Sequence, residues 1–92
     1  MHEEAMLRDV VRKAEEIARR EGGARVTRVR LWVGARSHLA GPELKDRWMH
    51  AVAGTNLAGA AVEIETSRDR LDPNAENVML RSLDVDSEGE RR

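Results

Sequence analysis

The first three residues gather nitrogen ligands at the start of the chain. His2 carries an imidazole, and the α-amine of Met1 and the backbone amides of His2 and Glu3 lie within two residues of it. Four nitrogens in one plane suit Ni(II) or Cu(II), whereas zinc prefers a tetrahedral site. A histidine at position 2 is more often incidental than a ligand. From the residues alone, both interpretations of His2 stay open.

Few other residues could do chemistry. His38 falls in a predicted loop, where it is a remote candidate for an additional metal contact, and His50 falls beside the apolar stripe of a predicted helix. The chain has no recognisable Ser-His-Asp arrangement, no glycine-rich phosphate loop and no cysteine. The lack of cysteine excludes disulfides, cysteine-ligated zinc, iron–sulfur clusters and thiol catalysis. We therefore expect that the protein is not an enzyme and has no catalytic residue.

Composition narrows the class of protein further. The chain has 92 residues, enough for one domain. Charged residues make up 36%, but 16 basic and 17 acidic residues leave a net charge of −1, which argues against a nucleic-acid partner. The longest apolar stretch, 57–62, is far shorter than the about 20 residues of a membrane span. The N-terminus does not resemble a secretory leader, so we expect a cytoplasmic protein without a membrane span.

The spacing of apolar residues predicts five elements: a helix at 4–21, a strand at 25–33, a helix from 41 to 54, and strands at 60–66 and 77–85. The apolar parity changes within the last strand, which predicts a β-bulge near Arg81 and Ser82. The order of elements predicts an α+β fold: a small, mostly antiparallel sheet of about three strands with two helices packed on one face. The first two strands are joined through a helix, so they need not be neighbours.

The same pattern divides the chain and identifies a candidate interface. Residues 1–86 are predicted as a single domain, and 87–92 as a charged, disordered tail. The outward face of the first strand carries Arg28, Arg30 and Trp32. An exposed tryptophan is typical of an interface, so these three are candidate partner-interface residues, although Trp32 could instead cover a neighbouring strand. An uncovered sheet edge would also allow a homodimer.

Several segments in register together resemble one protein family. They are Met1-His2-Glu3, the helix ending at Gly22, residues 25–31, Val33-Gly34-Ala35 with Ser37, Pro42-Glu43-Leu44, Gly54-Thr55, Gly59-Ala60, residues 62–65 and the closing strand at 78–86. The combination is similar to the HypA/HybF family, which are nickel metallochaperones of [NiFe]-hydrogenase maturation, some also serving urease. The resemblance covers residues 1–65 nearly without gaps, together with the last strand.

The resemblance implies a nickel site at the N-terminus. His2 would be the principal ligand, with the amine of Met1 and the backbone nitrogens of His2 and Glu3. The Glu3 side chain would act beside the metal or in its transfer. Ni(II) would be held transiently and handed to a partner. The implied partners are a nickel-handling GTPase and the hydrogenase large subunit.

The chain departs from the family between its second and last strands. There the family carries a zinc domain held by two Cys-x-x-Cys pairs. Here residues 67–76 fill the interval and contain neither Cys nor His, so we expect no zinc domain and no zinc. This departure supports an alternative function, a metal-free HypA-like adaptor or scaffold that docks to a hydrogenase or its maturation factors.

Overall fold

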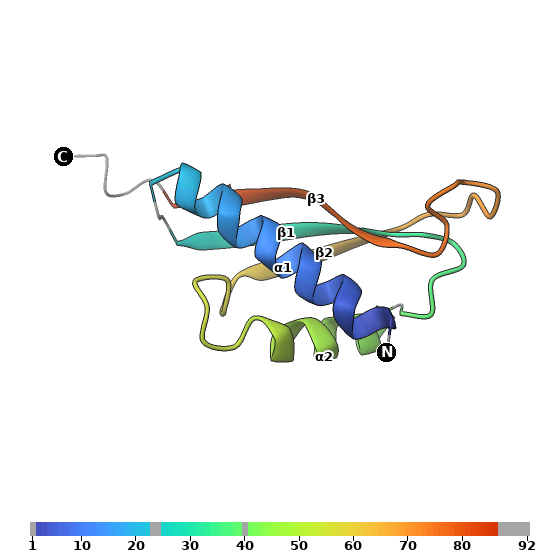
Figure 1. Cartoon of the computed structure of the whole chain (residues 1–92), viewed down its shortest axis with the longest axis horizontal. Helices are drawn as coiled ribbons and strands as arrows, with labels where there is room; N and C mark the ends of the chain where they lie inside the picture. The colour runs from blue at the N-terminus through green and yellow to red at the C-terminus, as the bar shows by residue number, and fades with distance from the viewer. Residues whose placement is uncertain (1, 23–24, 40, 87–92) are drawn as a thin grey trace.

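The structure, a computed structural model, describes residues 2–22, 25–39 and 41–86, with side chains from Ala5 onward. Its elements follow the order α1 (His2–Arg20), β1 (Val26–Val33), α2 (Gly41–Ala51), β2 (Ala61–Thr66) and β3 (Val78–Val85). Both helices lie on the same side of a three-stranded sheet (Figure 1), which confirms the predicted fold class. Within the described ranges, no helix is long and apolar enough to cross a bilayer. The tail predicted at 87–92 lies outside the described residues.

Helix α1 forms because its apolar residues repeat at three- and four-residue spacing along one stripe. The stripe is buried, with exposed fractions of 6% or less, at Leu7, Val10, Val11, Ala14 and Ala18. The helix ends at Arg20, and Gly22 follows with a φ of 95°, in the left-handed region that glycine tolerates. Near the other end of α1, the Sδ atom of Met6 accepts a hydrogen bond from the N–H of Val78 at 3.1 Å. The first turns of α1 are therefore tied to the start of β3.

The sheet has the strand order β2-β1-β3, with β1 in the centre. Strand β1 pairs parallel with β2 and antiparallel with β3. The first two strands are thus neighbours, which the sequence did not require. They can be neighbours because α2 lies in the connection between them, and a parallel pair needs a crossover of this kind. The sheet consequently contains one parallel and one antiparallel pair.

Strand β3 contains the predicted bulge. Ser82 lies opposite Arg30, and the next residue of β1, Leu31, lies opposite Leu80. Arg81 is therefore the extra residue on β3. The bulge lets Leu80 and Leu83, which differ in parity, both pack against the hydrophobic core.

The core lies between the helices and one face of the sheet. In β1, Val29, Leu31 and Val33 are each 1% exposed or less. From α2, Leu44 and Trp48 are buried to the same degree. Side chains alternate along a strand, so Arg30 and Trp32 of β1 point to the other side of the sheet. We call this side, opposite to the two helices, the open face.

A turn-rich connection, residues 67–77, joins β2 to β3. It lies against the end of β1, where the N–H of Gly34 donates to the carbonyl of Asn77 at 2.8 Å. A Cβ atom on Gly34 would lie 2.2 Å from the carbonyl oxygen of Ala75. Glycine is therefore required at position 34, because the two backbone segments approach too closely for any side chain.

Candidate functional site

The residues expected to bind a metal lie at the beginning of α1. Met1 is outside the described residues, and His2 and Glu3 are described by their backbone alone, as the first two residues of the helix. The first four N–H groups of an α-helix have no intrahelical acceptor. The backbone nitrogens of His2 and Glu3 can therefore take part in another interaction without breaking a helical hydrogen bond.

The other two histidines lie apart from any ligand cluster. His38 is exposed in the loop that follows β1, and His50 is exposed on α2. The Nδ1 atom of His50 lies 3.0 Å from the carbonyl oxygen of Asp46, one turn earlier in the same helix. Among the described residues, no three His, Cys, Asp or Glu side chains come together as a metal site would require. Within that part of the chain, neither His38 nor His50 joins a ligand cluster.

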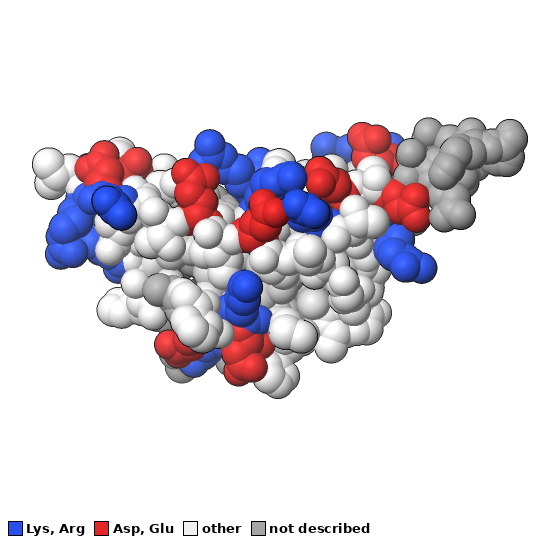
Figure 2. Space-filling view, turned by 180° about the vertical axis from the view of Figure 1, so that it is seen from behind, with Lys and Arg blue, Asp and Glu red and all other residues white. Residues whose placement is uncertain are grey.

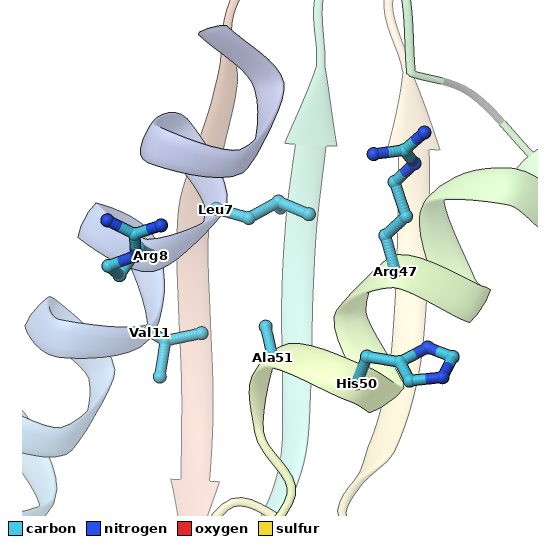
Figure 3. Close-up of a pocket in the computed structure, with 6 residues that line it drawn as sticks. All are labelled: Leu7, Arg8, Val11, Arg47, His50 and Ala51. Atoms are coloured by element: carbon cyan, nitrogen blue, oxygen red, sulfur yellow. The ribbon is translucent and has the colours of Figure 1, made fainter. Parts of the chain in front are cut away.

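A cleft of about 310 Å³ separates α1 from α2. Figure 3 shows Leu7 and Val11 of α1 facing Ala51 of α2 across it, with Arg8 and Arg47 on opposite sides. Arg47 lies 3.5 Å from the carboxylate of Glu43 on its own helix. Because the cationic groups do not converge on one point, the cleft has the character of a helix–helix contact with a charged rim.

The open face of the sheet carries a network of ion pairs. Arg28 Nη1 lies 2.6 Å from Glu63 Oε2, and Arg30 Nε lies 3.2 Å from the other oxygen of the same carboxylate. Arg30 Nη1 also lies 3.3 Å from Asp84 Oδ1. Figure 2 shows basic and acidic side chains interleaved in a band along the upper part of the molecule. The two arginines that were predicted as interface residues are therefore neutralised by carboxylates of the two flanking strands.

This network changes the acid–base behaviour of one member. The hydrogen bond and charge of Asp84, followed by the smaller effect of Glu63, raise the pKa of the Arg30 guanidinium above its ordinary value. The guanidinium is therefore held in its charged form. Arg30 thereby bridges Glu63 of β2 and Asp84 of β3.

Trp32 lies on the same open face, toward the 67–77 connection. It stands opposite Glu65 of β2 and Met79 of β3, and its side chain is partly exposed. Met79 is 38% exposed. The two residues place apolar surface beside the charged network, which is the arrangement expected of an interface residue. A role of Trp32, Arg28 and Arg30 in binding a partner remains a prediction.

A second pocket was not foreseen from the sequence. It has a volume of about 450 Å³ and lies between α2 and β2, where Trp48, Met49, Val52, Leu57 and Val62 line it. We call it the α2–β2 groove. The sequence feature that points to this groove is Met49, an apolar residue beside the buried stripe of α2. The Met49 side chain is 67% exposed.

Comparison with known proteins places the chain in a family. Residues 1–74 match the sequence model described as "Hydrogenase/urease nickel incorporation, metallochaperone, hypA". The chain is also 43% identical over 65 residues to the hydrogenase maturation factor HypA of Roseiflexus sp. (strain RS-1), an alignment that covers 71% of this chain and 53% of the relative. The chain thus spans about half the length of the curated relative that it matches. A family match that begins at the N-terminal nitrogen donors and continues through α1, β1, α2 and β2 shows that this chain belongs to the HypA family of nickel-incorporation metallochaperones.

Proposed function

We propose that this chain binds Ni(II) at its N-terminus and hands it to a partner during maturation of a [NiFe]-hydrogenase. The observation that carries the proposal is the family match, which includes the first three residues together with the elements that follow them. The name of the Roseiflexus relative supports hydrogenase as the destination. The nickel-handling GTPase and the hydrogenase large subunit are the proposed partners.

The proposed ligands are the amine of Met1, the imidazole of His2 and the backbone nitrogens of His2 and Glu3. The backbone nitrogens of His2 and Glu3 belong to the first turn of α1, which supports this assignment, because N–H groups there have no helical acceptor to lose. Nickel is the cargo, so its binding must be reversible. The amides and the imidazole lose protons as the metal binds, and nickel affinity should therefore fall as the pH falls below neutral.

The proposal is tested by titrating Ni(II) into untagged protein that starts at an authentic Met1. We expect the His2→Ala variant to lose at least tenfold in affinity. His50→Ala is the matched control, because His50 is exposed and is hydrogen-bonded within its own helix; it should bind nickel like the parent protein. Addition of one residue before Met1 should weaken binding as strongly as His2→Ala. If His2→Ala and the parent protein take up nickel equally, the proposed site is wrong.

The alternative is a docking adaptor that does not carry nickel. The partly exposed Trp32, beside the exposed Met79 on the open face, favours this function. Co-purification with a hydrogenase subunit separates the two proposals. For the adaptor, binding of the subunit survives His2→Ala and is lost with Trp32→Ala. If the subunit still binds both variants, the adaptor proposal is contradicted.

A further inference from the structure

One edge of strand β2 is paired with β1, and the other has no partner strand among the described residues. Strand β2 lies at the end of the strand order, and no described strand lies beyond it. The N–H of Ser67 donates to the carbonyl of Val33 at 2.8 Å, so Ser67 faces β1. Backbone groups of successive residues in a strand face alternate sides. The N–H and C=O groups of Val62, Ile64 and Thr66 therefore point away from β1, where an added strand could bond to them.

The α2–β2 groove lies beside this edge. Val62 belongs both to the edge and to the lining of the groove. The inward side chains of β2, Val62 and Ile64, are only partly buried, because the helices leave this margin of the sheet incompletely covered. A strand added to β2 would direct every second side chain toward the same layer. The groove, with the exposed Met49 at its margin, is an apolar receptacle for such a side chain.

The outward side of β2 has the opposite character. Glu63 and Glu65 stand there with side chains 51% and 62% exposed. Their cationic partners come from β1 and β3: Arg28 and Arg30 approach Glu63, and Arg81 approaches Glu65. An added strand would place its outward side chains directly next to the two glutamates. Basic side chains would be stabilised there, and acidic ones would be repelled.

This charge pattern disfavours a second copy of the chain as the occupant. Antiparallel pairing of β2 with its own copy would bring glutamates of the two copies next to each other. Like charges in cross-strand contact are destabilising. The favoured occupant is a different chain, with basic side chains where β2 has glutamates.

We propose that the free edge of β2 and the α2–β2 groove bind an extended segment of a partner protein as a fourth strand. The segment alternates apolar side chains, which enter the groove, with lysine or arginine side chains, which lie beside Glu63 and Glu65. Its backbone bonds to the outward groups of Val62, Ile64 and Thr66. This docking site is distinct from the N-terminal nickel site, and it does not depend on nickel binding.

The test uses two capped octapeptides, one alternating valine with lysine and the other alternating valine with glutamate. Binding is followed by NMR shifts of the Val62, Ile64 and Thr66 amides. We expect the lysine peptide to bind at least tenfold more tightly. Thr66→Pro removes one outward N–H without removing a bond to β1, and should weaken binding at least tenfold. Thr66→Ala keeps that N–H and should bind like the parent protein.

A charge variant tests the proposal independently if Thr66→Pro fails to fold. Glu65→Lys changes an exposed side chain, and it should remove most of the preference for the lysine peptide. Equal binding of the two peptides, or binding of neither, would overturn the proposal. So would equal affinity of Thr66→Pro and Thr66→Ala. A dimer of the protein that dissociates in Thr66→Pro would assign the edge to a second copy instead.

Discussion

Single residues on the open face of the sheet owe their state to partners far away in the sequence. Arg28 meets Glu63, 35 positions away, and Arg30 meets Asp84, 54 positions away. In the sequence, both arginines look like free cations suited to an acidic partner. In the structure they are neutralised, so Trp32 remains the stronger interface candidate of the three.

Replacement of Arg30 by lysine should weaken this network. A lysine has one ammonium group and cannot bridge Glu63 and Asp84 as the planar guanidinium does. We expect a lower Tm at low salt, with a smaller difference in 1 M NaCl because salt screens exposed pairs. Thermal unfolding at both salt concentrations tests this. Arg68→Lys, at an exposed position of the 67–77 connection, is the control and should leave the Tm unchanged at either concentration.

The raised pKa of Arg30 determines how this residue affects the pH dependence of folding stability. A group whose pKa is higher in the folded state stabilises the fold at every pH below its unfolded value. That contribution is lost only as the pH rises through the higher folded value, far into the alkaline range. The Tm difference between parent and Arg30→Lys should therefore stay constant from pH 6 to pH 9. A change across this range would mean that another group titrates with the network.

Gly34 offers a second test at the residue scale. A methyl group there would contact backbone atoms of Asn74 and Ala75 at 2.5 Å or less, so the 67–77 connection must move. We expect Gly34→Ala to lower the free energy of unfolding by about 1–3 kcal/mol, as overpacking typically does. Urea unfolding measures the change. Ala58→Ser, on an exposed turn residue, should stay within about 0.5 kcal/mol; an equally small effect at Gly34 would contradict the close approach.

At the scale of the elements, α2 has two apolar sides with different roles. Trp48 is 1% exposed and belongs to the core, whereas its neighbour Met49 is 67% exposed beside the α2–β2 groove. The Nε1 atom of Trp48 has no hydrogen-bond partner among the described residues. Trp48 therefore stabilises the fold through its buried apolar area alone.

Paired substitutions separate the two sides of α2. Trp48→Ala should lower the free energy of unfolding by about 3–5 kcal/mol, because it leaves a cavity under the helix. Met49→Ala should change it by no more than about 0.5 kcal/mol, since an exposed side chain loses little on truncation. Urea unfolding followed by far-UV circular dichroism measures both. A large loss of stability in Met49→Ala would show that Met49 packs into the core instead of lining an open groove.

At the scale of the whole molecule, Ni(II) should raise the free energy of unfolding only slightly. A ligand that binds only the folded state, at 100 times its Kd, raises the free energy of unfolding by about 2.7 kcal/mol. All four proposed nickel nitrogens come from three consecutive residues, so the unfolded chain offers nearly the same ligands. We expect the effect of Ni(II) on thermal unfolding to be well below that value, and to be absent in His2→Ala. The full increase would show that residues elsewhere in the fold complete the site.

The features that the sequence determined by itself depend on near neighbours in the chain. The amphipathic stripe of α1, the alternation in β1, the bulge at Arg81 and the nitrogen donors at the N-terminus are all of this kind. Only the tertiary structure decided that β1 and β2 pair in parallel, that Arg28 and Arg30 are neutralised, and that a groove opens beside the free edge of β2. The physical reason is that strand pairing, charge compensation and incomplete coverage of a sheet each join segments that are distant in the sequence. No local pattern of residues specifies such contacts.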